Sequence, residues 1–195
     1  MNKIKVSIKP KFVEFELDGI LLRAYADGSL ERYCDFVNKH YKAGWNKLSN
    51  TIDTHGYIHN KLNGKFYMRH RLIYKAFNQN WDITNTKNQI DHIDQDRLNN
   101  SISNLRIATH SQNQQNTKPR KNNKSGHKCI HAKNDRKMNS WFWKIEIDYN
   151  GKRFTKSFKA GDGLKPDILP DIPQHIIDIR DRELKRLHGE FACLA

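Results

Sequence analysis

The sequence predicts an α+β chain of two domains with different architectures, and three observations support this. Before residue 117, signals for β-hairpins are followed by a helical pattern and by a strand–loop–strand segment. After residue 126, three strand-like runs precede one amphipathic helix. The stretch from Thr117 to Gly126 is polar and basic and has no apolar period, which is typical of a linker. The chain has 195 residues, which is enough for two small domains.

The composition favours a partner with many negative charges. The formal net charge is +14 and only 36% of the residues are hydrophobic, so nucleic acid and an anionic membrane both qualify as partners. However, no stretch approaches the roughly 20 apolar residues of a membrane span. The segment after Met1 also lacks the apolar core of a signal peptide. We therefore expect a cytoplasmic protein with no membrane partner.

Cysteine usage argues against a disulfide framework and against a zinc site. The chain has three cysteines, Cys34, Cys129 and Cys193, and no C-x-x-C pair. An odd number of widely spaced cysteines gives neither a set of disulfides nor a zinc knuckle. We interpret all three as reduced structural thiols.

Residues 1–54 predict a β-rich extension. Residues Phe12 to Leu17 alternate between apolar and charged side chains, although the pattern leaves open which face is buried. Residues Leu21 to Tyr33 carry Asp27-Gly28 at their centre, which indicates a hairpin. No chemistry can be read from this region.

Residues 55–117 predict a hairpin, a helix and a second pair of strands. Asn63-Gly64 joins two short β-prone runs between residues 57 and 68, which is a strong hairpin signal. In residues 69–78, apolar side chains recur on one helical face. Residues 89–94 then predict a strand, residues 95–104 a polar loop, and residues 105–108 a returning strand. A helix should start near Thr109, because Thr109 and Gln112 resemble a capping box.

Asp91 and His92 are the candidate catalytic pair in this segment. Hydrolysis of a phosphodiester needs a base for the attacking water and a cation for the phosphate charge. A neutral imidazole suits the first task, and a metal ion held by carboxylate and amide oxygens suits the second. Neighbours on a regular strand point to opposite sides, so only an irregular strand end could aim both at one phosphate. Oxygen ligands favour Mg²⁺ or Mn²⁺ over Zn²⁺.

The same segment resembles the HNH nucleases of the ββα-metal class, particularly the phage and intron-encoded homing type. The resemblance covers about residues 55–117 and is carried by H70-R-L-I-Y-K-A-F77, I90-D-H-I-D94, N99-N100, N104-L-R106 and T109-H-S-Q-N113. It implies a ββα-metal fold, with His92 as the general base and one Mg²⁺ or Mn²⁺ ion held by Asp91 and Asn113. It also implies that Asn104 ties the loop so that the histidine is correctly posed.

Two points in this resemblance stay open. Asn116 lies one helical turn after Asn113 and is the competing metal ligand. The family usually has a glycine in the loop where this chain has Gln95. The turn at that point can therefore differ from that of the family.

The second half of the chain holds most of the excess positive charge. From Thr117 to Ala160 there are 13 basic and three acidic residues, which leaves an excess of +10. Charge alone would bind phosphates without sequence preference. Its placement on short strands suggests more, because a sheet face can enter the major groove of DNA.

Residues 127–195 resemble the APETALA/ethylene-response-factor type of DNA-binding domain. The resemblance is carried by N122-N-K-S-G126, K128-C-I130, W141-F-W-K-I145, N150-G-K-R-F154, F158 and the closing I176-I-D-I-R-D-R-E-L-K-R-L-H-G-E-F-A192. It implies a three-stranded sheet that reads the groove and is backed by one helix, which we expect over about residues 173–188. Residues 160–173 depart from the usual short connection between sheet and helix.

Candidate DNA contacts follow from the basic linker, residues 118–126, and from this second resemblance. Trp141 and Trp143 are two apart and share a strand face, which leaves Phe142 on the opposite face against the helix. Alternatively, one of the two tryptophans is a core residue. The full set of candidates is Lys118, Arg120, Lys121, Lys124, Lys128, Lys133, Arg136, Trp141, Trp143, Arg153 and Lys156.

The two resemblances together imply a sequence-directed DNA endonuclease of the homing type. It would act on double-stranded DNA in the cytoplasm of a bacterial or phage-infected cell, with a monomer favoured, and leave a 3′ hydroxyl and a 5′ phosphate. Two alternatives stay open. One is a regulatory DNA-binding protein with a vestigial nuclease fold, and the other is a nonspecific or restriction-type nuclease.

Overall fold

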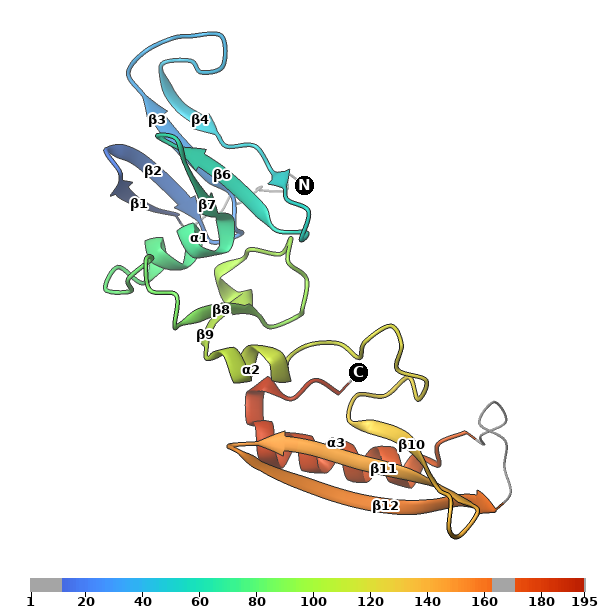
Figure 1. The fold of residues 1–195 in the computed structure, drawn as a ribbon. Helices are drawn as coiled ribbons and strands as arrows, with labels where there is room; N and C mark the ends of the chain where they lie inside the picture. The colour runs from blue at the N-terminus through green and yellow to red at the C-terminus, as the bar shows by residue number, and fades with distance from the viewer. Residues whose placement is uncertain (1–11, 163–170, 195) are drawn as a thin grey trace, which may run out of the picture. The chain divides into compact units, whose positions relative to one another are not determined.

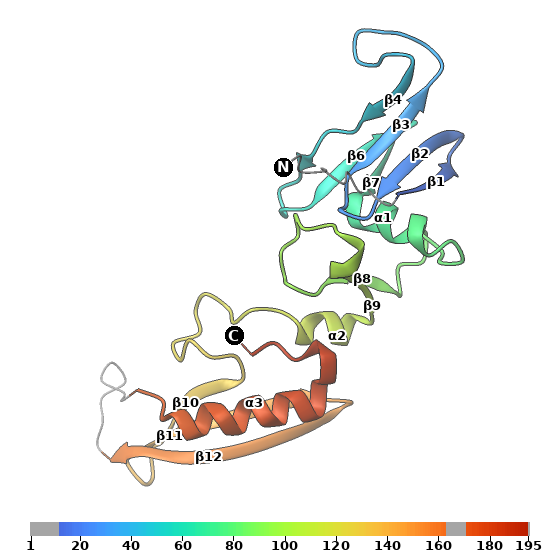
Figure 2. The same cartoon turned by 180° about the vertical axis from the view of Figure 1, so that it is seen from behind.

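The structure, a computed structural model, describes residues 12–162 and 171–194 of the chain. It divides into two units, of which the first runs to His110 and the second begins at Ser111. Figures 1 and 2 show the elements of each unit from opposite sides. The division falls earlier than the predicted boundary after Thr117. None of the helices in the described residues is long and apolar enough to span a membrane.

A four-stranded antiparallel sheet opens the first unit (Figure 1). Val13, Phe15 and Leu17 are its half-buried residues on the first strand, which answers the question of face that the sequence left open. The predicted hairpin around Asp27-Gly28 is confirmed, because the second and third strands pair on either side of it. In order across the sheet the strands are β1 (Phe12–Leu17), β2 (Ile20–Tyr25), β3 (Leu30–Cys34) and β4 (Gly44–Lys47).

A second, three-stranded sheet leads directly into the first helix. Its hairpin turns at Asn63 and Gly64, whose φ angles of 43° and 84° are the positive values that a type I′ turn needs. The helix starts at the residue after the last strand, as the sequence predicts. The elements are β5 (Thr51–Ile52), β6 (Ile58–Leu62), β7 (Lys65–Met68) and α1 (Arg69–Phe77).

A pair of short antiparallel strands completes the first unit. These are β8 (Gln89–His92) and β9 (Leu105–Ala108), and the short 3₁₀ helix η1 (Ile102–Asn104) precedes the second. In their register Asp91 lies opposite Arg106 and His92 lies opposite Leu105. The first strand thus ends at His92, whereas the sequence predicts a strand over residues 89–94, and the polar loop begins earlier than predicted.

The first unit has one hydrophobic core, and α1 lies at its centre. The helix packs against strands of the first two sheets and against β8. Its buried Leu72, Ile73 and Ala76 form the apolar face that the sequence predicts. The N-terminal sheet, expected as a separate extension, thus shares its core with the nuclease segment. The buried core residues are Ile20, Leu22, Ala24, Leu30, Leu48, Leu62, Leu72, Ile73, Ala76, Trp81, Ile90 and Leu105.

The second unit is a three-stranded antiparallel sheet with one long helix on a single face (Figure 2). Asn150 and Gly151 form the predicted turn between its last two strands, with φ angles of 46° and 72°. The elements are α2 (His110–Gln115), which starts at the end of the first unit, β10 (Ile130–Asp135), β11 (Ser140–Tyr149), β12 (Lys152–Asp162), α3 (Gln174–His188) and the 3₁₀ helix η2 (Gly189–Phe191). Of the departing connection predicted over 160–173, residues 163–170 lie outside the described part of the chain.

The segment predicted as a linker is organised by its own hydrogen bonds. Asn123 Nδ2 donates to the carbonyl oxygen of His127 over 2.8 Å. The hydroxyl of Ser125 lies 2.9 Å from that same oxygen and 2.6 Å from the carbonyl oxygen of Ile130. These contacts fold the end of the segment onto the start of β10.

Candidate active site and nucleic-acid interface

Asp91 and His92 are both buried at the end of β8, although they are neighbours on a strand. Their exposed fractions are only 4% and 5%. The strand ends at His92, and the backbone N–H of Gln95 donates to the carbonyl oxygen of His92 over 2.9 Å to close a turn. The turn begins immediately after the pair, which is the irregular strand end that the sequence argument requires.

Asp91 is held by an arginine that the sequence argument quoted in a motif but gave no role. Arg106 lies directly opposite on β9, and its Nε and Nη2 atoms are 2.9 and 2.8 Å from Asp91 Oδ2. Both side chains are almost fully buried. A buried carboxylate needs such compensation, because desolvation of an unpaired charge is costly. Pairing the predicted strands residue by residue would have found this contact.

His92 lies in a cage of rings and amides. Its ring centroid is 5.1 Å from that of His70 and 6.1 Å from that of Tyr57, and its Nε2 atom is 3.2 Å from Asn100 Oδ1. Burial lowers the pKa of His92 below its usual value, and the hydrogen bond with Asn100 opposes this shift. The imidazole is therefore neutral at neutral pH, which is the form that accepts a proton.

His70 is a second neutral imidazole beside the first. It lies at the start of α1, and its ring centroid is 5.3 Å from that of Tyr57. Burial lowers the pKa of His70 to about 3. Within the described part of the chain its Nδ1 atom is buried and has no hydrogen-bond partner. His70 thus adds no positive charge that would compete with proton uptake by His92.

Asn104 ties the loop between the two strands together. Its Nδ2 atom donates to Asp94 Oδ1 and to the carbonyl oxygen of Asn99, each over 2.8 Å. Its Oδ1 atom accepts from the backbone N–H of Asp94 over 3.0 Å. Gln95 adopts a φ of 65°, so the left-handed turn is present although the residue is not glycine. The side chain of Asn104 therefore fixes both ends of the segment that follows His92.

Replacing Asn104 with alanine should destabilise the first unit. The change removes three hydrogen bonds from a buried side chain and leaves their partners unsatisfied. We expect the free energy of unfolding to fall by about 2–4 kcal/mol, measured by urea denaturation. The matched change at exposed Asn80 should cost no more than about 0.5 kcal/mol. Equal stability of the two variants would contradict the tying role.

The second predicted metal ligand lies in α2. Asn113 is half-buried there, and Asn116 is buried just after the helix ends. Both belong to the second unit, so the pairing of either with Asp91 stays a prediction. The described residues contain no cluster of three or more His, Cys, Asp or Glu side chains that could hold a metal. A Mg²⁺-type ion does not need one, because it binds one or two protein oxygens and keeps several waters.

Comparisons with known proteins identify the family of this chain. A family model described as HNH endonuclease matches residues 67–115. Protein 3.8 of Escherichia phage T7 is 32% identical over 103 residues, which are 53% of this chain and 72% of that protein. This chain belongs to the HNH endonuclease family.

A solved structure is also similar to part of the chain. It is that of the HNH homing endonuclease I-HmuI, described as showing DNA binding and cleavage. The identity is 26% and the TM-score is 0.35, with 49% of this chain and 50% of that chain covered. The chain thus spans about half the length of that protein, and a TM-score of this size does not establish a shared fold.

The match to the HNH family includes Asp91, His92, Asn104 and Asn113. It leaves out the N-terminal four-stranded sheet and the whole sheet of the second unit. The roles of the four residues stay predictions, because the match establishes family and not mechanism.

The sheet of the second unit has a buried face and an open face. Trp143, Ile145 and Ile147 are buried and pack with residues of α3. The intervening residues of β11 point to the other side, which we call the open face. Cross-strand register assigns to it His131 and Lys133 of β10, Phe142, Lys144 and Glu146 of β11, and Arg153, Thr155, Ser157 and Lys159 of β12.

This arrangement corrects the predicted orientation of the aromatic residues. Trp143 is 5% exposed and belongs to the core, whereas Phe142 faces away from the helix. The expectation that Phe142 packs against α3 and that Trp143 faces DNA was wrong, and the alternative of one core tryptophan is confirmed. Trp141 is half-buried beside an irregularity in the register, and its role stays a prediction.

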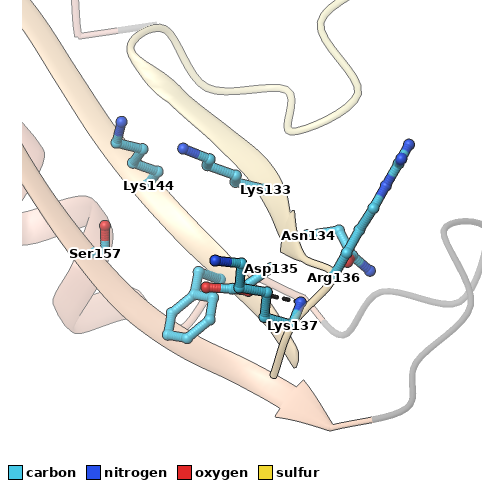
Figure 3. Close-up of a pocket in the computed structure, with 8 residues that line it drawn as sticks. Lys133, Asn134, Asp135, Arg136, Lys137, Lys144 and Ser157 are labelled. Carbon is cyan, nitrogen blue, oxygen red and sulfur yellow. Dashed lines mark hydrogen bonds between the residues drawn. The ribbon is translucent and has the colours of Figure 1, made fainter. Parts of the chain in front are cut away.

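A basic hollow lies on the open face near one end of the sheet (Figure 3). Its volume is about 510 Å³. Lys133 and Lys144 extend into it from neighbouring strands (Figure 3). The carboxylate of Asp135 accepts hydrogen bonds from the backbone N–H groups of Lys137 and Met138, so it stabilises the turn between β10 and β11. The lining residues are Lys133, Asn134, Asp135, Arg136, Lys137, Phe142, Lys144 and Ser157.

Two predicted DNA contacts have other partners or positions. The Nζ atom of Lys128 donates to the carbonyl oxygens of Gln114, Gln115 and Thr117 over 3.0, 2.7 and 2.7 Å, so it caps the end of α2. Lys156 lies opposite Ile145 and hence on the face that carries α3. The predicted placement of these two lysines on a DNA-reading face is not supported.

The other predicted contacts stay candidates. Lys133 and Arg136 line the basic hollow. Arg153 is on the open face and forms an exposed ion pair with Asp148, with Nε 2.6 Å from Oδ1. The linker residues Lys118, Arg120, Lys121 and Lys124 are all exposed. Lys137 and Lys144 also line the hollow, although the sequence argument did not name them as contacts. Lys144 lies in a predicted strand, whereas Lys137 lies in the turn between β10 and β11, which the sequence argument did not identify.

Proposed function

We propose that this chain is a sequence-directed DNA endonuclease of the homing type. It hydrolyses phosphodiesters with His92 as the general base and with one Mg²⁺ or Mn²⁺ ion. The observation that carries the proposal is the burial, at one strand end, of a neutral imidazole beside a carboxylate. Both residues lie within the segment that matches the HNH endonuclease family.

The mechanism divides the work between three side chains. His92 takes a proton from the attacking water through its neutral ring. Asp91 and Asn113 would hold the ion, and the donor set fits a hard cation because both side chains offer oxygen. When bound, such an ion offsets the charge on the scissile phosphate and on the leaving oxygen. Cleavage of the bond between the phosphorus atom and the O3′ oxygen gives a 3′ hydroxyl and a 5′ phosphate.

We propose double-stranded DNA as the substrate and the open face of the second unit as the reading surface. The resemblance to an APETALA-type domain supports this, as does the basic hollow with its exposed linker cations nearby in sequence. We further propose a monomer that acts in the cytoplasm of a bacterial or phage-infected cell. Similarity to a protein of Escherichia phage T7 supports that setting.

One observation favours a second candidate function. Arg106 contacts one oxygen of Asp91, which places a side-chain cation beside the carboxylate that is expected to bind the metal ion. This is compatible with a regulatory DNA-binding protein whose nuclease fold is vestigial. One measurement distinguishes the two functions, namely whether the protein nicks plasmid DNA in the presence of Mg²⁺.

The metal prediction tests both functions at once. With Mg²⁺ or Mn²⁺ the wild-type protein should nick a plasmid that carries its target, and chelation should stop it. Asp91→Ala and Asn113→Ala should both weaken activation by the ion, because each change removes an oxygen ligand. We expect a rise in the metal concentration needed for half-maximal nicking of at least about tenfold.

The matched variant is Asn116→Ala. If it loses activation while Asn113→Ala keeps it, the amide ligand lies one helical turn later than proposed. Nicking that survives chelation, or that only zinc restores, contradicts the metal assignment. A wild-type protein that binds DNA but never cuts it supports the vestigial function.

A further inference from the structure

We propose that Asn100 is a positioning residue for His92 and that the turn at Gly28, in the N-terminal hairpin, holds Asn100 in place. The N-terminal sheet would then be part of the catalytic machinery, although the HNH family match does not include it. The inference rests on the proposed function only in that His92 is taken as the base.

The amide of Asn100 can take only one orientation. Its Nδ2 atom donates to the carbonyl oxygen of Leu98 over 3.0 Å, and this places Oδ1 3.2 Å from His92 Nε2. An amide oxygen can only accept a hydrogen bond, so Nε2 of the neutral imidazole must carry the proton. The lone pair of the ring then lies on Nδ1, and Asn100 has selected the tautomer in which Nδ1 is the basic atom.

Burial makes the other tautomer of His92 energetically unfavourable. Asn100 is 3% exposed and His92 is 5% exposed, so water has little access to either group. If the ring took the other tautomer, two lone pairs would face each other in a region of low dielectric. Groups that orient a reactive side chain in this way typically contribute about 10- to 100-fold to activity.

The backbone of Asn100 lies against Gly28, which occupies the turn between β2 and β3. A Cβ atom at residue 28 would lie 2.5 Å from the carbonyl carbon of Asn100 and 2.6 Å from its oxygen. Real contacts are never this close, and neither partner is a flexible side-chain end. Gly28 also has a φ of 88°, which disfavours any side chain. The glycine therefore allows the two backbones to touch.

Further hydrogen bonds lock the loop to this turn. The backbone N–H of Ile102 and the hydroxyl of Ser101 each donate to the carbonyl oxygen of Ala26 over 3.0 Å. On the other side of the turn, Arg69 of α1 is buried and its Nη1 atom donates to the carbonyl oxygen of Gly28 over 3.3 Å. The turn is thus fixed to the core helix and to the loop that carries Asn100.

The first test removes the hydrogen-bond acceptor of Asn100 but keeps a side chain of similar volume. Asn100→Leu in the full-length protein should lower the single-turnover rate of cleavage by about 10- to 100-fold, with the dissociation constant for DNA unchanged. Asn100→Asp keeps an oxygen acceptor toward Nε2 but loses the donor to the carbonyl oxygen of Leu98, so its rate should lie between those of Asn100→Leu and the wild type. A leucine variant that cleaves within about twofold of wild type overturns the inference.

A second readout does not depend on cleavage. Long-range ¹H–¹⁵N correlation spectra of His92, recorded without metal or DNA, report which ring nitrogen carries the proton. We expect the Nε2–H form in the wild type and a mixture of tautomers in Asn100→Leu. An Nδ1–H form in the wild type overturns the inference even if the enzyme is active. The expected spectra from a protein that never cuts DNA would instead count against the proposed function.

The third test addresses the N-terminal turn and has a matched control. Gly64 has a φ of 84°, close to that of Gly28, but a Cβ atom there would meet nothing within 4 Å. Gly28→Ala should therefore shift the tautomer and lower the cleavage rate as Asn100→Leu does, whereas Gly64→Ala should only reduce stability. Equal cleavage rates in the two alanine variants contradict the role of the turn. If Gly28→Ala does not fold, the two Asn100 variants still decide the positioning role.

Discussion

Replacing His92 with alanine is expected to lower the single-turnover rate of DNA cleavage by at least about a hundredfold, which is the scale of lost general-base catalysis. The affinity for DNA should stay unchanged, because the side chain is buried and contributes no positive charge at neutral pH. The measurement compares cleavage of a mapped target in Mg²⁺ with binding of the same DNA in the presence of a chelator, where cleavage should stop.

The control for this variant is His40→Ala, which removes an exposed imidazole from the same unit. It should cleave at the wild-type rate. Because His92 packs on His70 and Tyr57, thermal unfolding of the variant must also be recorded. Near-normal cleavage by a folded His92→Ala protein would remove the central assignment of the proposed mechanism.

Removing the positive charge of the basic hollow should have the second large effect. We expect a fourfold glutamine variant of Lys133, Arg136, Lys137 and Lys144 to bind DNA much more weakly at low salt. Each lost phosphate contact takes about 0.9 from the slope of log affinity against log salt, so the slope should fall by up to roughly 3–4. Titrations at four or more salt concentrations measure this slope directly.

A control variant with the same change in net charge distinguishes the contribution of the open face from that of the overall charge of the second unit. Lys152 and Lys156 lie on the sheet face that carries α3, and Arg182 and Lys185 are exposed on α3 itself. Their replacement by glutamine should leave the slope almost unchanged. If both fourfold variants lose affinity equally, binding depends on the overall charge of the second unit and the open face is not the reader.

The parts of the fold that follow from local chemistry were predictable. Asn63-Gly64 and Asn150-Gly151 both form the expected turns, because these dipeptides tolerate the positive φ angles that a tight hairpin needs. The apolar face of α1 also agrees with the sequence argument, and the tie formed by Asn104 agrees with what the resemblance to the HNH nucleases implies. In each case the decisive residues lie within about ten positions of one another.

The orientation of β11 follows from the alternation of its residues. Trp143 has the same parity as Ile145 and Ile147, whereas Phe142 has the parity of Lys144 and Glu146. Alternation alone therefore assigns Trp143 to the core. Interpreting the two tryptophans as a pair of DNA contacts, without their apolar neighbours Ile145 and Ile147, gives the wrong face.

Contacts between distant segments could not be derived from the sequence. Nothing near Lys128 indicates that its ammonium group caps a helix that ends 13 residues earlier. The same holds for the approach of Gly28 to Asn100, since a glycine after an aspartate already has a sufficient local reason to exist in a hairpin. Both contacts depend on tertiary packing, and local propensity does not report on that.

The placement of α1 at the centre of one shared core limits how this nuclease can be exchanged between proteins. The segment that matches the family, residues 67–115, would carry the helix away from the sheets that cover it. Leu72 and Ile73 would then face water, at a cost of about 1.5–3 kcal/mol each. Recombination that transplants the catalytic motif must therefore also move the first two sheets, so the heritable unit is about twice as long as the motif by which the family is identified.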